Sequence, residues 1–257
     1  YRYGNYEIVG ILILITWLFI RPLNKWSLAY WLLFIVSIII TLVLINHRSA
    51  TIALLFSIFI VNYLNYSHNL IRVLKKSFDI TLIVCIFALP FILFYKTEFY
   101  ASFERLITII SPTEEENASW RLFLWKFIFS DMNVFDFLIG KGWGWQIPDF
   151  QFNYRTYSAE EKIVGFHNSL LFYFYHLGFF GIGTFLLFLI NCYKNAIKDM
   201  KNCSRKIQFK VNSLIAANLG ILVFSLFNVV LEGPYMSFFF WITLGMIYNY
   251  PNLYNQR

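Results

Sequence analysis

Two arginines and one histidine are the residues of this sequence best placed to do chemistry, because each stands beside a long apolar run. Arg48 lies between two apolar runs, Arg121 lies within a nearly all-apolar segment, and His167 opens the uncharged run 166–191. A guanidinium can hold a phosphate through two parallel hydrogen bonds. A histidine, with an ordinary pKa of about 6.5, can take a proton from a hydroxyl. These residue types suit a reaction on a phosphate-bearing substrate at a membrane surface.

The same residues also have structural interpretations, which the sequence leaves open. Arg48, in a short hairpin, can simply extend toward lipid headgroups. Arg121 can pair with the three glutamates at 114–116, although its apolar neighbours would equally favour an anionic ligand. His167 and Asn168 can together cap the helix that is expected to begin there.

A glycine-rich turn and a glutamate are further candidates. Glycines alternate with other residues over 140–144, where Trp143 also lies. Such glycines allow tight turns or the close approach of a ligand, and the tryptophan suits the headgroup layer. We therefore count Gly142 and Trp143 as substrate-binding candidates. Glu232, at the tip of the last apolar hairpin, can orient a substrate hydroxyl or pair with an arginine. His176 falls on another face of its helix and is interpreted as structural.

The composition indicates the class of protein. Hydrophobic residues make up 59% of the 257 residues and charged residues only 14%, which is typical of a polytopic membrane protein. The net charge of +7 does not indicate nucleic-acid binding, because the basic residues gather in short loops between apolar runs. Three cysteines, none in the long polar loop, indicate neither a disulfide framework nor a cysteine metal site. The chain begins without Met or a signal peptide, and we expect it to be part of a longer protein.

We predict an all-α fold, a polytopic integral membrane helix bundle of about seven spans forming a single membrane domain over residues 1–257. The spans are expected at 6–20, 27–46, 50–66, 77–95, 166–191, 212–231 and 234–250. The loops rich in Lys and Arg belong on the cytoplasmic side, which places the loop 96–165, between the fourth and fifth spans, on the extracytoplasmic side.

That extracytoplasmic loop is expected to contain a helix. Its start is indicated by Ser111-Pro112-Thr113-Glu114, a capping box with proline at the first helical position, and its end is expected near Ser130. The sequence contains no glycine-rich nucleotide fingerprint, Asp-x-Asp pair, His-Glu-x-x-His or Gly-x-Ser-x-Gly. We therefore expect no metal, no cofactor and no reaction that uses a nucleotide sugar.

Taken together, these motifs resemble the O-antigen ligase and O-antigen polymerase superfamily of bacterial membrane glycosyltransferases. The resemblance rests on Arg48-Ser49-Ala50, on the Arg-x-x-x-Trp from Arg121 to Trp125, on the glycine turn 140–144, and on His-Asn-x-x-Leu at 167–171 followed by Gly-x-x-Gly at 178–181. It covers roughly residues 40 to 245. The superfamily commonly has more spans, so N-terminal spans are expected to be missing from this chain.

The resemblance implies a metal-independent, inverting transfer of a polyprenyl-diphosphate-linked glycan to an acceptor hydroxyl. Arg48 and Arg121 would hold the diphosphate, and His167 would deprotonate the acceptor. Substrate-binding roles would fall to Asn168, Trp125, Gly142, Trp143 and Glu232. The implied partners are the lipid-linked donor, a glycan or lipid A-core acceptor, the lipid bilayer and other polysaccharide assembly proteins. The implied location is the bacterial inner membrane, with the active site facing the periplasm or the outside.

Several functions stay open at this point. A polymerase that extends a lipid-linked repeat unit is favoured over a ligase that modifies lipid A-core, because the outer loop is modest in size. A polysaccharide or lipid transporter is a more distant alternative, since transporters place charged groups near the bilayer midplane and these spans are nearly free of charge. A purely structural subunit would tolerate the loss of His167.

Overall fold

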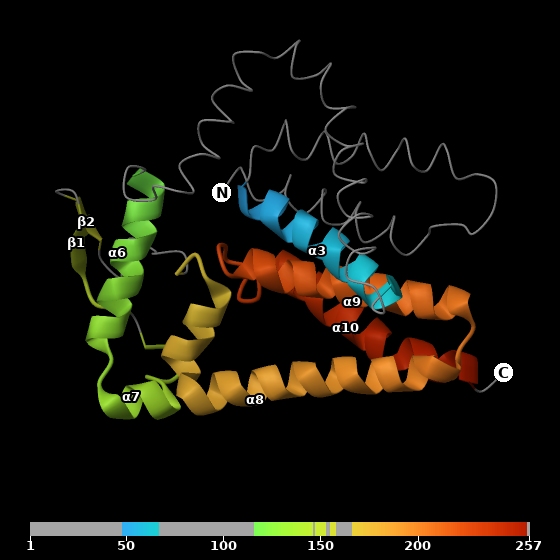
Figure 1. Ribbon diagram of the computed structural model, residues 1–257. Coiled ribbons are helices and arrows are strands. Elements are labelled where there is room, and N and C mark those ends of the chain that lie inside the picture. The colour runs from blue at the N-terminus through green and yellow to red at the C-terminus, as the bar shows by residue number, and fades with distance from the viewer. Residues whose placement is uncertain (1–47, 67–115, 146, 153–154, 158–165, 256–257) are drawn as a thin grey trace, which may run out of the picture. The chain divides into compact units, whose positions relative to one another are not determined.

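The computed structural model describes residues 48–66, 116–145, 147–152, 155–157 and 166–255 (Figure 1). Apart from one small hairpin, this part of the chain is helical, which confirms the predicted helical class. Its elements are α3 (Arg48–Tyr66), α6 (Glu116–Asp131), α7 (Val134–Ile139), β1 (Phe150–Phe152), β2 (Arg155–Tyr157), α8 (Ser169–Asp199), η3 (Met200–Asn202), α9 (Arg205–Ser225) and α10 (Pro234–Asn255).

The described helices agree with several of the predicted spans. α3, α8 and α10 overlap the spans expected at 50–66, 166–191 and 234–250. α9 begins before residue 212, where a span was expected, and it ends at Ser225, short of residue 231. The last turn of that predicted span is wrong because its backbone amides bond to a side chain of α8 instead of continuing the helix.

Two of the described helices are long and apolar enough to cross a membrane, namely Ser169–Asn202 and Arg205–Ser225. Shorter apolar helices cover Ile52–Asn65 and Met236–Asn249. The spans predicted at 6–20, 27–46 and 77–95 lie outside the described residues, as does the capping box at 111–114. Within the outer loop, the helix expected to end near residue 130 is α6, which ends at Asp131.

A two-stranded hairpin in the outer loop departs from the purely helical prediction. β1 pairs antiparallel with β2, and Gln151 lies opposite Thr156. The sequence of β1, Phe-Gln-Phe, alternates apolar and polar residues as a strand does. Three alternating residues are too few to predict a strand from sequence, and β1 is a strand because it pairs with β2.

The chain divides into two compact units. Of the described residues, the first unit holds α3, Cys192–Phe224 and the residues from Phe238 onward, and the second holds 116–191 and Ser225–Ser237. A single membrane domain over 1–257 and an extracytoplasmic loop over 96–165 stay predictions. Arg48 belongs to the first unit, and every other candidate residue named above belongs to the second.

Close packing and buried polar bonds hold the helices of the first unit together. Gly220 of α9 lies so near α3 that an added Cβ would stand 2.0 Å from the Ser57 hydroxyl oxygen, a small-residue contact common between membrane helices. Asn218 of α9 donates hydrogen bonds to the Phe240 carbonyl and the Thr243 hydroxyl of α10, at 2.8 and 2.7 Å. The apolar core of this unit therefore also carries specific polar contacts.

α8 contains a bend at Gly178, whose backbone is far from helical at φ 65° and ψ −169°. A positive φ of this kind is readily adopted only by glycine. Residues 169–177 and 179–199 are therefore separate helical arms, and Figure 1 shows the chain turning sharply where α7 meets the end of the long arm. The short arm and the residues before it carry most of the candidate site.

Candidate active site

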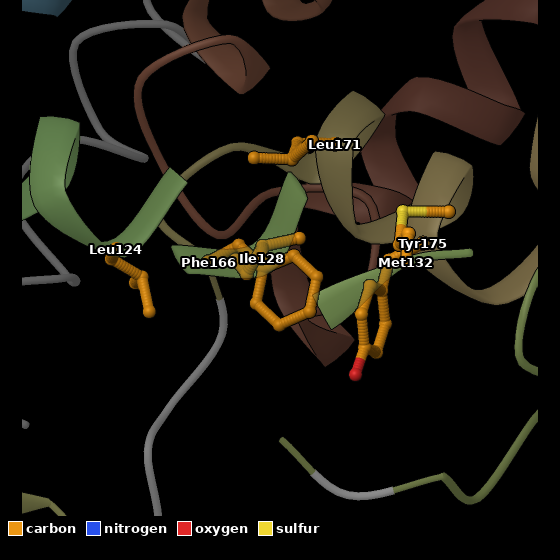
Figure 2. Packing of buried hydrophobic residues seen from close by; sticks show 6 residues of the cluster. All are labelled: Leu124, Ile128, Met132, Phe166, Leu171 and Tyr175. Atoms are coloured by element: carbon orange, nitrogen blue, oxygen red, sulfur yellow. The ribbon is translucent and has the colours of Figure 1, made fainter. Parts of the chain in front are cut away.

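One face of α6 anchors the site. Leu124 and Ile128 are fully buried and pack with Phe166, just before α8, and with Tyr175 in its short arm (Figure 2). Met132 and Leu171 complete the cluster. Burying side chains of this size contributes roughly 1.5–3 kcal/mol each. The sequence suggested a helix that is apolar almost all round, and its buried face is the one that packs against the start of α8.

A hydrogen bond fixes α6 against the residue that precedes His167. The indole N–H of Trp125 donates to the Phe166 carbonyl at 2.9 Å. Arg121 lies one helical turn before Trp125, on the same side of α6. This arrangement brings the Arg121 guanidinium close enough to His167 to lower the pKa of the imidazole. The charge of Arg121 thus acts on His167, 46 positions further along the sequence, whereas the predicted convergence of both residues with Arg48 in one site stays a prediction.

His167 is held in an unusual conformation and environment. Its φ is 49°, a left-handed value that few non-glycine residues adopt. The edge of its ring meets the Trp120 ring, with 5.4 Å between centroids. Burial first, and the Arg121 charge second, lower the pKa of His167 to about 4. The imidazole is therefore uncharged at neutral pH and can accept a proton.

Asn168 has a structural task. Its side-chain oxygen accepts a hydrogen bond from the Leu171 amide at 3.0 Å, and its backbone carbonyl accepts one from the Phe172 amide at 3.0 Å. Asn168 is therefore the N-cap of α8. Of the pair interpreted above as a possible cap, Asn168 supplies the capping oxygen, and the His167 ring contacts Trp120 instead.

Ser169 connects the start of α8 to the segment that follows α9. Its buried hydroxyl accepts hydrogen bonds from the Val230 and Leu231 amides, at 2.9 and 3.1 Å, and donates one to the Asn228 carbonyl at 3.1 Å. The Tyr173 hydroxyl donates to the Leu231 carbonyl at 3.1 Å. The segment that carries Glu232 is thereby fixed next to the His167-Asn168 pair in the same unit.

Glu232 has an unusual carboxylate. Both of its oxygens are buried and make no hydrogen bond of normal geometry with the described residues. Burial raises the pKa of Glu232, although the nearby Ser169 hydroxyl and the amides of the 230–232 segment oppose that rise. The two roles considered for this residue, pairing with an arginine and orienting a substrate hydroxyl, stay predictions.

The glycine turn docks onto the bend of α8. Lys141 N–H and Gly142 N–H donate to the carbonyls of Tyr175 and His176, at 2.9 and 3.0 Å. In a regular helix these carbonyls would bond amides four residues further on, so the turn replaces bonds that the bend at Gly178 removes. In return, His176 Nδ1–H donates to the Gly142 carbonyl at 2.8 Å, which fixes the proton on that nitrogen.

Trp143 stands on the outer side of that turn. One face of its indole stacks on the His176 ring, with 5.4 Å between centroids and 7° between planes. The side chain is nevertheless 63% exposed. His176, interpreted from sequence as structural, therefore supports Trp143, and an exposed aromatic face of this kind can pack on a sugar ring.

An ion-pair network ties the turn to α6 and α7. Lys141 Nζ lies 3.0 Å from an Asp131 carboxylate oxygen and 3.4 Å from one of Asp136. The Tyr175 hydroxyl donates to Asp131 at 2.7 Å. Burial lowers the pKa of Lys141, but the two carboxylates outweigh it and raise the pKa above its ordinary value. The ammonium of Lys141 is therefore held in its charged form next to Asp131 and Asp136.

Arg48 is the first residue of α3, and its side chain lies outside the described residues. Its predicted convergence with Arg121 and His167 therefore stays a prediction. Trp125 and Gly142 are both expected to bind substrate. In the contacts given above, Trp125 uses its indole N–H and Gly142 uses its backbone N–H and carbonyl. Their substrate contacts also stay predictions, together with those of Asn168, Trp143 and Glu232.

A family model described as O-antigen ligase matches residues 34–186 of the chain, more than half of its length. The chain belongs to the O-antigen ligase family. Neither a search of curated proteins nor a search of solved structures found a match. Membership identifies this O-antigen ligase family member as a membrane glycosyltransferase of the ligase and polymerase type, and lipid-linked glycans are the substrates that the family implies.

The matched segment of this O-antigen ligase family member contains nearly all of the candidate residues. Arg48, Arg121, the glycine turn and His167 lie inside 34–186, whereas Glu232 lies beyond its end. The sequence reading overlooked Ser169 and Lys141. Ser169 follows an Asn that caps a helix, where serine is common as a first-turn residue, so no signal marks it. Lys141 could have been noticed as a cation between two glycines.

Proposed function

We propose that this protein polymerises polyprenyl-diphosphate-linked glycan repeat units by inverting, metal-independent transfer to an acceptor hydroxyl. The observation that carries the proposal is the buried His167 imidazole, whose ring contacts Trp120 of α6 and whose pKa is lowered by burial and by the charge of Arg121, the next residue of that helix. The reaction requires both functions at one place, a cation for the departing diphosphate and a base for the acceptor.

The chemistry assigns each group a task. The acceptor oxygen attacks the anomeric carbon of the donor from the face opposite the diphosphate, and its proton passes to the His167 imidazole. The bond between the anomeric carbon and the phosphate oxygen breaks, and the diphosphate leaves with the electron pair. Arg121 neutralises the charge that develops on it, and Arg48 is the second cation predicted for this task. Attack from the opposite face inverts the anomeric configuration.

The lowered pKa of His167 fits this scheme. An imidazole with a pKa of about 4 is neutral at pH 7 and ready to accept a proton. A bound diphosphate would add negative charge beside it and raise that pKa toward the working pH, where a base is most effective. The resting state is therefore uncharged, and donor binding strengthens the base.

The remaining candidates fit roles in substrate recognition. The buried carboxylate of Glu232 would accept a hydrogen bond from a sugar hydroxyl, and the exposed face of Trp143 would pack on a sugar ring. We place the active site on the outer face of the bacterial inner membrane, which follows from the lysine and arginine distribution. The acceptor we favour is a second lipid-linked repeat unit, since it reaches the site along the same lipid surface as the donor.

Reconstitution tests the proposal directly. The purified protein, in liposomes that contain only a lipid-linked repeat unit, is expected to produce a ladder of longer chains. Product formed only when lipid A-core is added would identify a ligase. Arg121→Lys keeps the charge but loses the fork, and His167→Gln keeps the size but loses the base, so we expect each to lose at least about a hundredfold in turnover.

A control on the same helix separates chemistry from folding. Lys126 is exposed on α6, and Lys126→Gln changes charge there without touching the cluster that anchors the helix. We expect this variant to keep wild-type turnover. Wild-type turnover in both Arg121→Lys and His167→Gln would contradict the proposed roles.

A further inference from the structure

α7 exposes apolar side chains in almost every direction. Val134 is 81% exposed and Phe135 65%, and none of the six residues of the helix is buried. Leu138 and Ile139 are exposed as well. A contiguous apolar surface of this kind on a folded protein marks a place where another apolar phase or partner covers it.

The polar side chains at the start of α7 are paired with backbone amides and with a charged partner. Asn133 and Asp136 form a capping box, in which the Asn133 side chain accepts from the Phe135 and Asp136 amides and Asp136 accepts from the Asn133 amide. The Asp136 carboxylate is also 3.4 Å from Lys141 Nζ. Backbone and charged groups left unpaired in hydrocarbon each cost several kcal/mol, so these bonds lower the cost of placing the start of α7 among acyl chains.

α7 is continuous with the apolar surface of α8. Its C-terminal end touches the bend of α8 so closely that a Cβ on Gly178 would lie 2.4 Å from Gly140 N and 2.5 Å from Ile139 N. Phe179 and Phe180, which follow the bend, are 62% and 60% exposed. The exposed apolar side chains of α7 therefore lie next to those that open the long arm of α8.

The charges along the long arm limit the part of it that can lie in hydrocarbon. Residues 179–193 carry no charge and the first charged residue is Lys194, so the uncharged part is about 22 Å long at 1.5 Å per residue. A hydrocarbon core is about 30 Å thick. The hydrocarbon would therefore extend past the bend at Gly178, to the level of α7.

We propose that α7 inserts into the acyl chains of a phospholipid bilayer, in the leaflet that surrounds the bend at Gly178. The insertion does not depend on the proposed reaction.

Spin labels report the surroundings of α7 directly. Single cysteines are placed at Val134, at Leu187 in the exposed middle of the long arm, and at Asn202 beyond its end. The full chain, with native cysteines replaced, is labelled in liposomes of phosphatidylcholine and phosphatidylglycerol. We expect the label at 134 to collide several-fold more with oxygen, relative to a water-soluble nickel complex, than the label at 202. Its depth should be shallower than that of 187.

Two results would overturn the inference. Nickel access at 134 equal to that at 202 would place α7 in water. Shielding of 134 from both reagents would mean that protein, such as a second copy of the chain, covers it. Because replacement of the cysteines can disturb folding, a photo-crosslinking residue at Val134 in the chain with its native cysteines gives a second measurement, in which crosslinks to lipid are expected. None of these readouts uses glycan synthesis, so they are independent of the proposed activity.

Discussion

The contact between Gly140 and α8 allows a sharp quantitative prediction. A Cβ on Gly140 would stand 2.3 Å from the carbonyl carbon and oxygen of His176 and 2.4 Å from the Leu177 nitrogen. These are backbone atoms, which cannot move aside as the end of a flexible side chain can. Gly140→Ala must therefore push the glycine turn away from the bend of α8.

The cost has separate sources. The backbone of Gly140, at φ 79° and ψ 171°, lies in a region that essentially only glycine adopts, and it is unfavourable for alanine by about 1–3 kcal/mol. Relief of the overlap costs about 1–3 kcal/mol more. Separation of the turn from α8 also weakens the two hydrogen bonds that Lys141 and Gly142 donate to it, worth about 0.5–1.5 kcal/mol each. We expect Gly140→Ala to lower the free energy of unfolding by about 3–9 kcal/mol in total.

Two other alanine substitutions serve as matched controls. Gly142 has a φ of 87°, but no atom of the described residues lies within 4 Å of a new Cβ, so Gly142→Ala adds only backbone strain, about 1–2 kcal/mol. Gly183 is helical and likewise has no neighbour within 4 Å in the described part of the chain, so Gly183→Ala should change stability by less than about 1 kcal/mol.

Thermal unfolding in detergent measures this order. We expect Gly140→Ala to lower the melting temperature on the order of 10 °C, Gly142→Ala to lower it less, and Gly183→Ala to leave it nearly unchanged. If Gly142→Ala destabilised as much as Gly140→Ala, strain alone would account for both. The close docking of the turn on α8 would then have no energetic weight.

Three further predictions concern the residues around the reaction centre. The acid limb of kcat/KM should fall near pH 4, because protonation of His167 in the free enzyme removes the base. The acid limb of kcat should lie about 1–3 pH units higher, because bound diphosphate raises the pKa of His167. Acid limbs at the same pH would contradict the proposed binding of the diphosphate next to the imidazole. Ser169→Ala leaves the buried Val230 and Leu231 amides without their acceptor, so we expect it to lower the unfolding free energy by about 2–4 kcal/mol, measured by denaturant titration. Trp125→Phe keeps an aromatic side chain but loses the hydrogen bond to the Phe166 carbonyl, which should lower the unfolding free energy by roughly 1 kcal/mol. We expect turnover to fall by more than this loss of stability explains, because Arg121 shifts relative to His167. Equal losses of turnover and stability would show that the bond is only structural.

The sequence singles out the candidate residues, but it does not predict the shape of the segments that hold them. Arg121 and His167 could be singled out because a charged or titratable group among apolar residues needs a reason, and both lie in the second unit, where the charge of Arg121 lowers the pKa of His167. The bend at Gly178 could not be predicted, because glycine is common in membrane helices without bending them. Here the bend depends on Lys141 and Gly142, whose amides satisfy the carbonyls it leaves free.

Other features escaped prediction for a related reason. Ser169 is important through partners about sixty residues away, and nothing in the local pattern shows such long-range hydrogen bonds. The end of α9 was misplaced because the apolar residues after Ser225 continue the hydrophobic pattern, although their amides bond to Ser169. Periodicity indicates which residues avoid water, but tertiary hydrogen bonds decide where a helix ends.

The closeness of Arg121 and His167 links the resting state of the site to its proposed action. The same proximity that lets the guanidinium lower the pKa of the imidazole lets a diphosphate, bound to that guanidinium, raise it again. With the two residues far apart, a bound donor would change the imidazole little, and the base would be equally strong with or without it. In the proposed reaction, this coupling would make the acceptor hydroxyl easiest to deprotonate when the leaving group is in place, so binding of the donor would activate the acceptor.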